Sequence, residues 1–334
     1  MNIKIEALIS ALSQLFKTNI VSADYQTVPL HGGTVGSVFL VTGTAETADR
    51  KPLPYRVVLK VQTKWERYAD PNSWRREYDL YASDLESTFL DDLRWPTCYH
   101  AEMNEEETEF HLWLEYVDGV SSLALTGDMY EQAALELGRY QGKLFAEQPP
   151  VLQSLTNLSY ADLMKKTYLH YRSWPLVYNY IRSEDCEIPK HLRDMLIAID
   201  ENSDEIFSRI EQLPLVLCHR DFWVANLIHT SGKIVVLDWD TSGWGYLGED
   251  LASLIADETG VDLMVDYYHR CVPAYYKGFS EYADVPPVEE HCVYEMILIV
   301  FGYRLVESYL HAEDEVEKKN ALRTLQQVYE MKNK

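Results

Sequence analysis

Asp221, Asn226 and Asp238 are three oxygen-bearing side chains in and just after a short polar segment between apolar runs. The segment reads Val216-Leu-Cys-His-Arg-Asp-Phe-Trp-Val-Ala-Asn-Leu-Ile-His and is followed by Ile234-Val-Val-Leu-Asp-Trp-Asp. Short apolar runs predict buried strands, and the polar residues at the ends of such strands are expected to converge. Mg²⁺ prefers hard oxygen ligands of this type. Phosphoryl transfer needs that metal and one further carboxylate that orients the acceptor hydroxyl and takes its proton.

The order of these residues resembles that of kinases. His219-Arg-Asp221 with Asn226 matches the catalytic-loop pattern H-R-D-x-x-x-x-N, and Asp238 follows where a metal-binding aspartate is expected. However, Asp238-Trp-Asp differs from the D-F-G of protein kinases, and no A-P-E follows it. Together with the Gly-rich stretch and Asp250-Leu-Ala that come next, it resembles the aminoglycoside phosphotransferase and choline kinase-like family.

The resemblance implies a role for each member of the set. Asp221 would be the catalytic carboxylate, and Asn226 and Asp238 would hold Mg²⁺ against the phosphates of ATP. The implied reaction is in-line transfer of the γ-phosphoryl group to a hydroxyl of a small molecule.

Four neighbouring polar residues have less direct roles. His219 is interpreted as a structural histidine rather than a proton carrier, and the resemblance implies that Asp250 anchors the catalytic loop. Two roles for Asp240 are equally open: a secondary contact to the metal and a structural hydrogen bond. Arg220 departs from the family, which more often has Gly or Asn at this position.

A Gly-rich turn and a lysine-bearing strand indicate nucleotide binding in the first part of the chain. His31-Gly-Gly-Thr-Val-Gly-Ser-Val matches G-x-G-x-x-G-x-V except at His31. Gly33 and Gly36 would allow backbone N–H groups to approach phosphate, because no Cβ intrudes. Lys60 would contact the phosphates, with Glu77 as its ion-pair partner. The alternative is that Glu77 lies on a solvent-exposed helix face.

The segment Leu114-Glu-Tyr-Val-Asp-Gly119 resembles the family's connector between two lobes. Adenine would hydrogen-bond to backbone groups near Glu115 and Val117. The resemblance therefore implies a bilobal, protein kinase-like α+β fold. Residues 1–118 would form an N-lobe with a small antiparallel β-sheet and one helix, and residues 119–334 a larger, mainly helical C-lobe.

The elements expected from sequence patterns agree with this division. Strands are predicted at residues 38–42, 55–61, 110–116, 215–218, 227–229 and 234–237, and a turn at 105–109. Helices are predicted from residue 72 or 73, and at residues 130–145, 192–210 and 288–310, besides an amphipathic helix within residues 1–16.

Composition excludes several classes of function. The chain has 53 acidic and 30 basic residues, a formal charge of −23, which argues against binding to nucleic acid or to an anionic membrane. Its five scattered cysteines contain no C-x-x-C pair and are expected to be reduced thiols. No apolar run is long enough to span a membrane, and the N-terminus lacks the features of a signal peptide. A cytoplasmic location is expected.

The best interpretation is an ATP-dependent small-molecule kinase. Two alternatives stay open, a protein kinase and a nucleotide-binding pseudokinase that serves as an interaction module. The sequence does not identify the acceptor or distinguish ATP from GTP, although a cationic acceptor is favoured. Acidic residues are expected to line the acceptor side: Glu184, Asp185, Glu187, Asp257 and Glu258.

Overall fold

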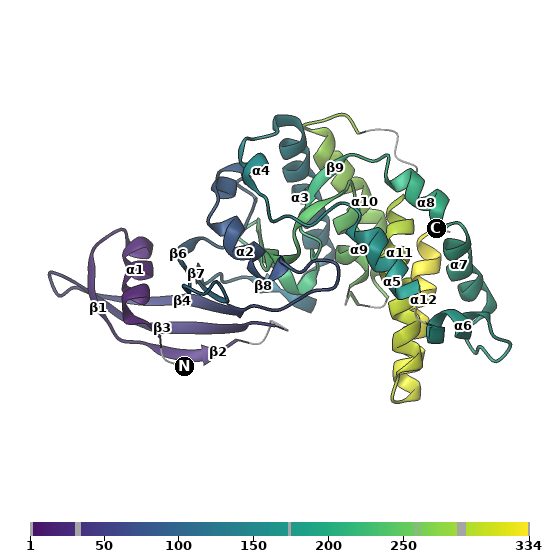
Figure 1. Cartoon of the computed structure of the whole chain (residues 1–334), viewed down its shortest axis with the longest axis horizontal. Helices are drawn as coiled ribbons and strands as arrows, with labels where there is room; N and C mark the ends of the chain where they lie inside the picture. Colours follow the sequence, from purple (N-terminus) through teal and green to yellow (C-terminus); the bar gives the residue numbers. More distant parts are fainter. Residues whose placement is uncertain are drawn as a thin grey trace.

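The structure, a computed structural model, describes residues 3–30, 35–172, 175–257, 259–260, 262–285 and 292–332. It has the predicted bilobal α+β fold, with an antiparallel sheet at one end and a larger, mainly helical part at the other (Figure 1). We refer to these two parts as the N-lobe and the C-lobe.

The N-lobe sheet has the strand order β1-β3-β4-β7-β6, and β2 pairs with residues 39–42 of β3. Its strands are β1 (Ile20–Ala23), β2 (Gln26–Pro29), β3 (Ser37–Thr47), β4 (Pro52–Thr63), β6 (Cys98–Met103) and β7 (Glu109–Glu115). The predicted turn between β6 and β7 is confirmed. The Asn104 side chain closes it by accepting hydrogen bonds from the backbone N–H groups of Thr108 and Glu109.

Alternation along β7 places its side chains on two faces, as a period of two requires. Trp113 packs with the buried Leu8 and Leu12 of helix α1 (Ile5–Phe16), which confirms the predicted amphipathic helix. On the other face, Phe110 and Leu112 pack with Trp74 of helix α2 (Ser73–Tyr81). The N-lobe therefore contains α1 in addition to the one helix implied by the resemblance, because the second face of the sheet also needs an apolar cover.

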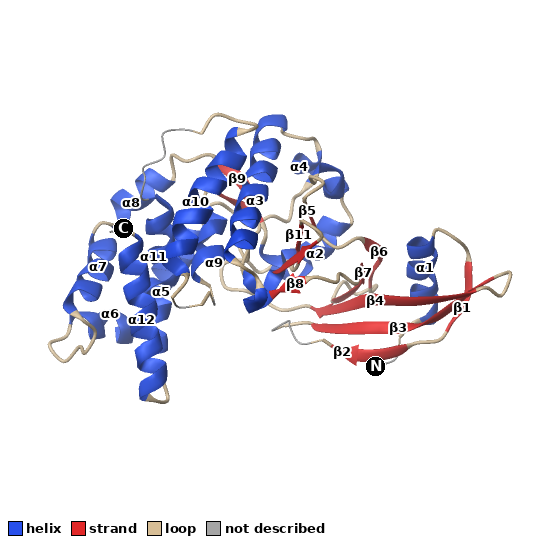
Figure 2. Cartoon of the chain, turned by 180° about the vertical axis from the view of Figure 1, so that it is seen from behind, coloured by secondary structure: helices blue, strands red, loops and turns tan. Residues whose placement is uncertain are grey.

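Helices dominate the C-lobe (Figure 2). They are α3 (Gly127–Glu147), α4 (Val151–Ser154), α5 (Leu163–Arg172), α6 (Pro175–Arg182), α7 (Lys190–Glu201), α8 (Ser203–Ile210), α9 (Glu249–Ala256), α10 (Met264–Ser280), α11 (Cys292–Leu310) and α12 (Glu315–Met331). Helices α3 and α10 approach closely because Gly138 and Gly278 have no side chain at their crossing. A Cβ at either glycine would lie 2.1 Å from a backbone oxygen of the other helix.

The single helix predicted over residues 192–210 is instead two helices, α7 and α8. The chain leaves helical geometry at Asn202, whose side chain donates a hydrogen bond to the Ala198 carbonyl at 2.7 Å. Asparagine competes with helix backbone hydrogen bonding in this way, which explains the break. The predicted helix over residues 288–310 is confirmed from Cys292 onward, and residues 288–291 lie outside the described part.

Small sheets carry the polar segment singled out from the sequence. Strand β9 (Leu215–Cys218) pairs with β12 (Gly243–Tyr246), and β10 (Leu227–Thr230) forms a hairpin with β11 (Lys233–Val236). Two earlier segments join the hairpin: β8 (Val120–Ser121) pairs with β10 and β5 (Leu93–Arg94) with β11. The chain segment assigned to the N-lobe thus contributes one short strand to a C-lobe sheet.

Two absences hold within the described residues. No helix there combines the length and apolar character needed to cross a membrane. No disulfide bond links the five cysteines, all of which lie in described segments.

Candidate active site

The β10–β11 hairpin brings together residues that are twelve positions apart in the sequence. Asn226 ends a short 3₁₀ turn (Val224–Asn226) directly before β10, and Asp238 is the second residue after β11. The Leu237 N–H donates to the Asn226 carbonyl at 2.8 Å, which closes the hairpin at this end. Asp238 itself lies in the left-handed region, with φ of 59°. A non-glycine residue is held there only by its surroundings, as is common at functional sites.

A cavity of about 510 Å³ lies between the N-lobe sheet and this hairpin. Its apolar walls come from both lobes and include Val58 and Leu114 of the sheet and Ile228 and Leu237 of the hairpin region. Seven of the nine predicted site residues line it: Lys60, Glu77, Glu115, Val117, Asp221, Asn226 and Asp238. The tertiary structure therefore brings together groups from four separate parts of the chain.

Lys60 is the central cation of the cavity. Its Nζ lies 2.5 Å from Glu77 Oε2 and 2.6 Å from Asp238 Oδ1. Burial alone would lower the pKa of Lys60, but the charges of Asp238 and Glu77 raise it above its usual value. Burial raises the pKa of Glu77, and the Lys60 charge opposes that change. The side chain of Glu77 is only 2% exposed, so the alternative of a solvent-exposed glutamate is wrong.

Asp221 and Asn226 contact each other directly. Asn226 Nδ2 donates to Asp221 Oδ2 at 2.8 Å and to the Asp221 carbonyl at 2.9 Å. Burial, followed by the charge of Asp238, raises the pKa of Asp221 to about 7. A carboxylate with this pKa is a better proton acceptor near neutral pH than an ordinary aspartate.

The donor set suits a magnesium ion. Because the Asn226 nitrogen is committed to Asp221, its side-chain oxygen is left for a metal, and Asp238 adds a carboxylate. Within the described residues, no three His, Cys, Asp or Glu side chains are grouped to hold a metal by themselves. Two protein ligands supplemented by phosphate oxygens and water are typical of Mg²⁺ in nucleotide sites.

The predicted glycines give a mixed result. Gly33 lies outside the described residues. A Cβ at Gly36 would lie 2.6 Å from Gln62 Oε1 and 2.9 Å from the Val61 carbonyl, so glycine is needed there for the close approach of β3 to β4. Gly36 is not among the residues that line the cavity.

The connector is fixed at Glu115 and open at Val117. Arg94 holds the Glu115 carboxylate at 2.6 and 2.9 Å, and the Glu115 N–H donates to the Thr97 carbonyl. Across the described residues, none of the hydrogen bonds uses the Val117 N–H. The Glu115 side chain therefore braces the connector, while the backbone at Val117 is available to a ligand.

Asp250 and His219 hold the loop around Asp221 in place. The buried Asp250 carboxylate accepts hydrogen bonds from the backbone N–H groups of His219 and Arg220 and from Gln141 Nε2. His219 Nε2 lies 2.9 Å from the Leu237 carbonyl, and the Asp221 N–H donates to its Nδ1. Burial lowers the pKa of His219 to about 4, so the ring is neutral at pH 7.

Arg220 is part of the same support. Its φ is 65°, a conformation that glycine and asparagine adopt most readily, which accounts for the family preference at this position. Its guanidinium donates to Ser159 Oγ and to the Trp244 carbonyl, both at 2.6 Å, and Nε lies 3.0 Å from Glu249 Oε1. These contacts tie the loop to β12 and α9.

Two arginines beside the site, Arg67 and Arg76, are not among the residues expected from the sequence. Arg67 pairs with the Asp240 carboxylate at 3.2 Å, and Arg76 donates to the Asp240 carbonyl at 2.7 Å. Asp240 lies more than 160 positions from each arginine in the sequence, so no local sequence pattern could predict these two contacts. The Asp240 side chain is therefore engaged in an ion pair, in line with the structural alternative for this residue.

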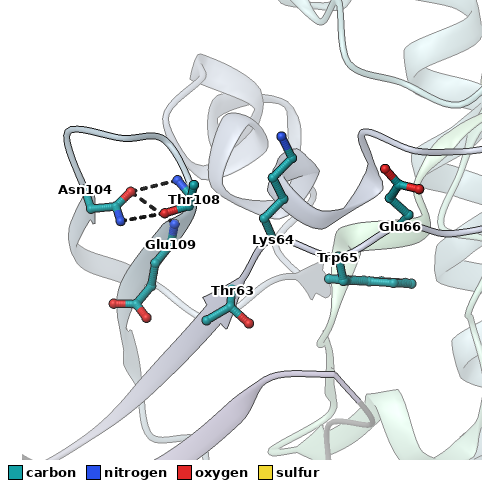
Figure 3. A pocket seen from close by; sticks show the side chains of 7 residues that line it. All are labelled: Thr63, Lys64, Trp65, Glu66, Asn104, Thr108 and Glu109. Carbon is teal, nitrogen blue, oxygen red and sulfur yellow. Dashed lines mark hydrogen bonds between the residues drawn. The ribbon is translucent and has the colours of Figure 1, made fainter.

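A second hollow, of about 570 Å³, lies at the end of β4 and is formed by Thr63, Lys64, Trp65, Glu66, Asn104, Thr108 and Glu109. Figure 3 shows that Asn104 is bonded to Thr108 in the hairpin turn and that the Lys64 ammonium extends away from Trp65. None of the predicted site residues contributes to this hollow, so the site is assigned to the cavity between the lobes.

Comparisons with known proteins identify the family of this chain and the solved structures that share its fold. Residues 28–283 match the sequence profile of a family described as the phosphotransferase enzyme family. No curated protein matches the chain in a sequence search.

Solved structures with the same fold include three kinases. One is a microcompartment-associated aminopropanol kinase (15% identity, TM-score 0.57, covering 96% of this chain and 95% of that chain). An amicoumacin kinase in complex with AMP-PNP, Ca²⁺ and Ami is 12% identical (TM-score 0.56, 91% and 88% covered). A choline kinase from Cryptosporidium parvum is 15% identical (TM-score 0.55, 92% and 89% covered). Identities this low establish the shared bilobal fold alone.

Proposed function

Because this chain belongs to the phosphotransferase enzyme family, we propose that it transfers the γ-phosphoryl group of ATP to a hydroxyl group of a small molecule. The observation that carries the proposal is the convergence of Lys60, Asp221, Asn226 and Asp238 on one cavity between the lobes. A nucleotide-binding module without catalysis would need the lysine and the metal ligands, but it would not need Asp221.

In this proposal residues 1–118 bind the nucleotide. The base would lie between the apolar walls and hydrogen-bond to the backbone of the connector at Val117. Lys60, held by Glu77, would contact the α and β phosphates. Residues 119–334 would supply the catalytic loop, the metal ligands and the acceptor site.

Asn226 and Asp238 would hold Mg²⁺, which when bound neutralises phosphate charge and orients the transferring group. Asp221 would accept a hydrogen bond from the acceptor hydroxyl and take its proton as the new O–P bond forms and the bond to the β-phosphate oxygen breaks. Burial beside Asp238, which raises the pKa of Asp221 to about 7, supports this role as proton acceptor.

We further propose that the acceptor is cationic. Besides Asp238, the charges of Asp240, which is paired with Arg67, and of Asp257 act on Asp221 and raise its pKa, so negative charge is concentrated near the reacting position. Two of the solved structures named above are an aminopropanol kinase and a choline kinase, and both aminopropanol and choline carry a positive charge near neutral pH.

One part of the acidic lining expected from the sequence is wrong. Glu184, Asp185 and Glu187 lie in the segment that joins α6 to α7, at the end of the C-lobe remote from the N-lobe sheet (Figure 1). The Glu187 carboxylate accepts a hydrogen bond from the Tyr309 hydroxyl. Glu258 lies outside the described residues, and Asp257 is the described member of that set whose charge acts on Asp221.

The test is an acceptor screen with purified protein and Mg²⁺, with ATP and GTP in parallel. The panel should contain amino alcohols, quaternary ammonium alcohols, aminoglycosides and neutral sugars. Nucleoside diphosphate release and the mass of the phosphorylated product are measured together. The Asp221→Asn variant is the control for contaminating kinases. Nucleotide binding without acceptor-dependent release, equal in both proteins, would favour the non-catalytic module.

A further inference from the structure

Helix α2 carries three consecutive charged residues, Arg75, Arg76 and Glu77, which have different surroundings. Arg75 is 30% exposed and pairs with Asp79 and Glu107 at the surface. The Arg76 side chain is 1% exposed. A helix of nine residues gains little stability by itself, so its position must come from tertiary contacts.

The Arg76 guanidinium contacts three different segments of the chain. It donates to both oxygens of Asp70, in the loop before α2, at 2.8 and 2.6 Å. Its Nε donates to the Asn157 carbonyl at 2.6 Å, and Nη1 donates to the Asp240 carbonyl at 2.7 Å. Asn157 and Asp240 both belong to the C-lobe, so one N-lobe side chain is bonded to two C-lobe backbone groups.

Burial of a guanidinium is unfavourable unless an anion compensates its charge and acceptors satisfy its N–H groups. Asp70 provides the anion, and the Asn157 and Asp240 carbonyls accept hydrogen bonds from Nε and Nη1 of the guanidinium. Lysine cannot reproduce this arrangement, because its ammonium is a point charge without a planar fork. The position therefore requires arginine for its geometry.

The adjacent residue makes a parallel contact. Glu77 Oε1 accepts a hydrogen bond from the Trp239 N–H at 3.4 Å, while Oε2 pairs with Lys60. Two consecutive residues of α2 thus contact two consecutive residues, Trp239 and Asp240, of the loop that begins with Asp238. We call residues 238–242 the metal loop.

We infer that Arg76 is a positioning residue that fixes α2 to the metal loop, so that the Lys60–Glu77 pair stays formed whether or not nucleotide is bound. Arg76 lines no part of the cavity and acts through Glu77 and the Asp240 backbone. The inference rests on the proposed function, since it concerns how the same site is assembled. It implies that activity does not depend on a movement of α2 toward the C-lobe.

Hydrogen exchange of the wild-type protein gives the first test. Peptides covering 73–81 and 238–242 should be protected without nucleotide, and a non-hydrolysable ATP analogue with Mg²⁺ should change the protection of 73–81 little. Rapid exchange of 73–81 that is lost only when the nucleotide is added would overturn the inference. This measurement needs no turnover, so it stays informative even if no acceptor is ever found.

Arg76→Lys and the matched surface variant Arg75→Gln give the second test. In Arg76→Lys, exchange of both peptides should rise by roughly tenfold, since local opening is no longer resisted by the fork. The Mg²⁺ concentration that half-saturates nucleotide binding should rise as well, and kcat should fall by roughly 10- to 100-fold, as misplacement of reacting groups produces. Arg75→Gln should match the wild type in all three.

A smaller folded fraction would lower kcat without changing the half-saturating Mg²⁺ concentration, so the metal titration separates positioning from stability. The inference is wrong if folded Arg76→Lys protein keeps wild-type exchange in both peptides, or if Arg75→Gln changes them equally. If Arg76→Lys fails to fold, the wild-type exchange experiment decides the question.

Discussion

Lys60 Nζ lies 2.6 Å from Asp238 Oδ1, so the lysine that would contact phosphate also contacts the carboxylate that would hold the metal. The same ammonium pairs with Glu77 at 2.5 Å. In this arrangement a single cation balances two carboxylates, the buried Glu77 and the partly exposed Asp238. Mg²⁺ would neutralise part of the charge of Asp238 in place of Lys60, because it is a second cation at the site.

Asp238→Ala tests this exchange directly. The variant lacks a charged metal ligand, so its ATP affinity should fall when Mg²⁺ is present and change little in EDTA. Isothermal titration calorimetry of ATP binding, with Mg²⁺ and with EDTA, measures the loss of affinity under each condition. An equal loss of affinity in both conditions would contradict the role of Asp238 as a metal ligand.

Asp221→Asn should nearly abolish phosphoryl transfer. The amide keeps the shape of the side chain but cannot take a proton, a loss that typically costs about 10²- to 10⁴-fold in rate. Mg-ATP affinity should stay within a few-fold, since Asp221 is proposed to act on the acceptor. Single-turnover kinetics and nucleotide titration check the two halves. Turnover near the wild-type rate in pure variant protein would remove Asp221 from the mechanism.

Arg220→Met should destabilise the protein. The Arg220 and Glu249 side chains are both more than nine-tenths buried, and removal of one member of a buried ion pair costs about 3 kcal/mol or more. The double variant Arg220→Met/Glu249→Met should recover part of the loss, because no buried charge is left uncompensated. Chemical denaturation of the wild type, of Arg220→Met, of Glu249→Met and of the double variant measures this coupling. Additive losses would show that the ion pair contributes nothing by itself.

His219 should make the fold sensitive to acid. Its pKa is lowered to about 4 by burial, whereas an unfolded histidine has its usual, higher pKa. The unfolded chain therefore binds the proton first as pH falls. The stability that the neutral ring contributes above pH 6.5 is lost progressively down to about pH 4, on the order of 3 kcal/mol in total.

The check for His219 is the difference in unfolding free energy between the wild type and His219→Gln, measured from pH 8 to pH 4. At pH 8 this difference in unfolding free energy reflects the packing and hydrogen bonding of the His219 side chain. A decrease of the difference on acidification reflects the lowered pKa of His219 in the folded protein. A constant difference across the range would show that the folded ring titrates normally.

A cationic acceptor should be recognised through charge. At saturating Mg-ATP, its KM should rise with added salt, because ions screen the carboxylates around Asp221. A neutral substrate of similar size, if one is turned over, serves as the control and should show a flat salt series. Phosphorylation confined to neutral or anionic alcohols would reject the cationic acceptor and leave the phosphotransferase proposal intact.

The sequence determined the local framework of the site. The short apolar strands within residues 215–237 fold as predicted, and their spacing fixes where Asp221, Asn226 and Asp238 lie. The lysine strand, the helix with Glu77 and the connector also follow from short-range patterns and their order. Such patterns are readable because side-chain periodicity is a property of neighbouring residues.

Only the tertiary structure decided which charges meet. Arg67 and Arg76 contact Asp240 of the metal loop, more than 160 positions away in the sequence. Arg220 pairs with Glu249, one of the 53 acidic residues of the chain. The tertiary structure also places Glu184 away from the expected acceptor side. The residues next to Glu184 in the sequence do not determine at which end of the C-lobe it lies. Partner choice depends on how whole elements pack, and packing is set by the shapes of all of them together rather than by the period of any one.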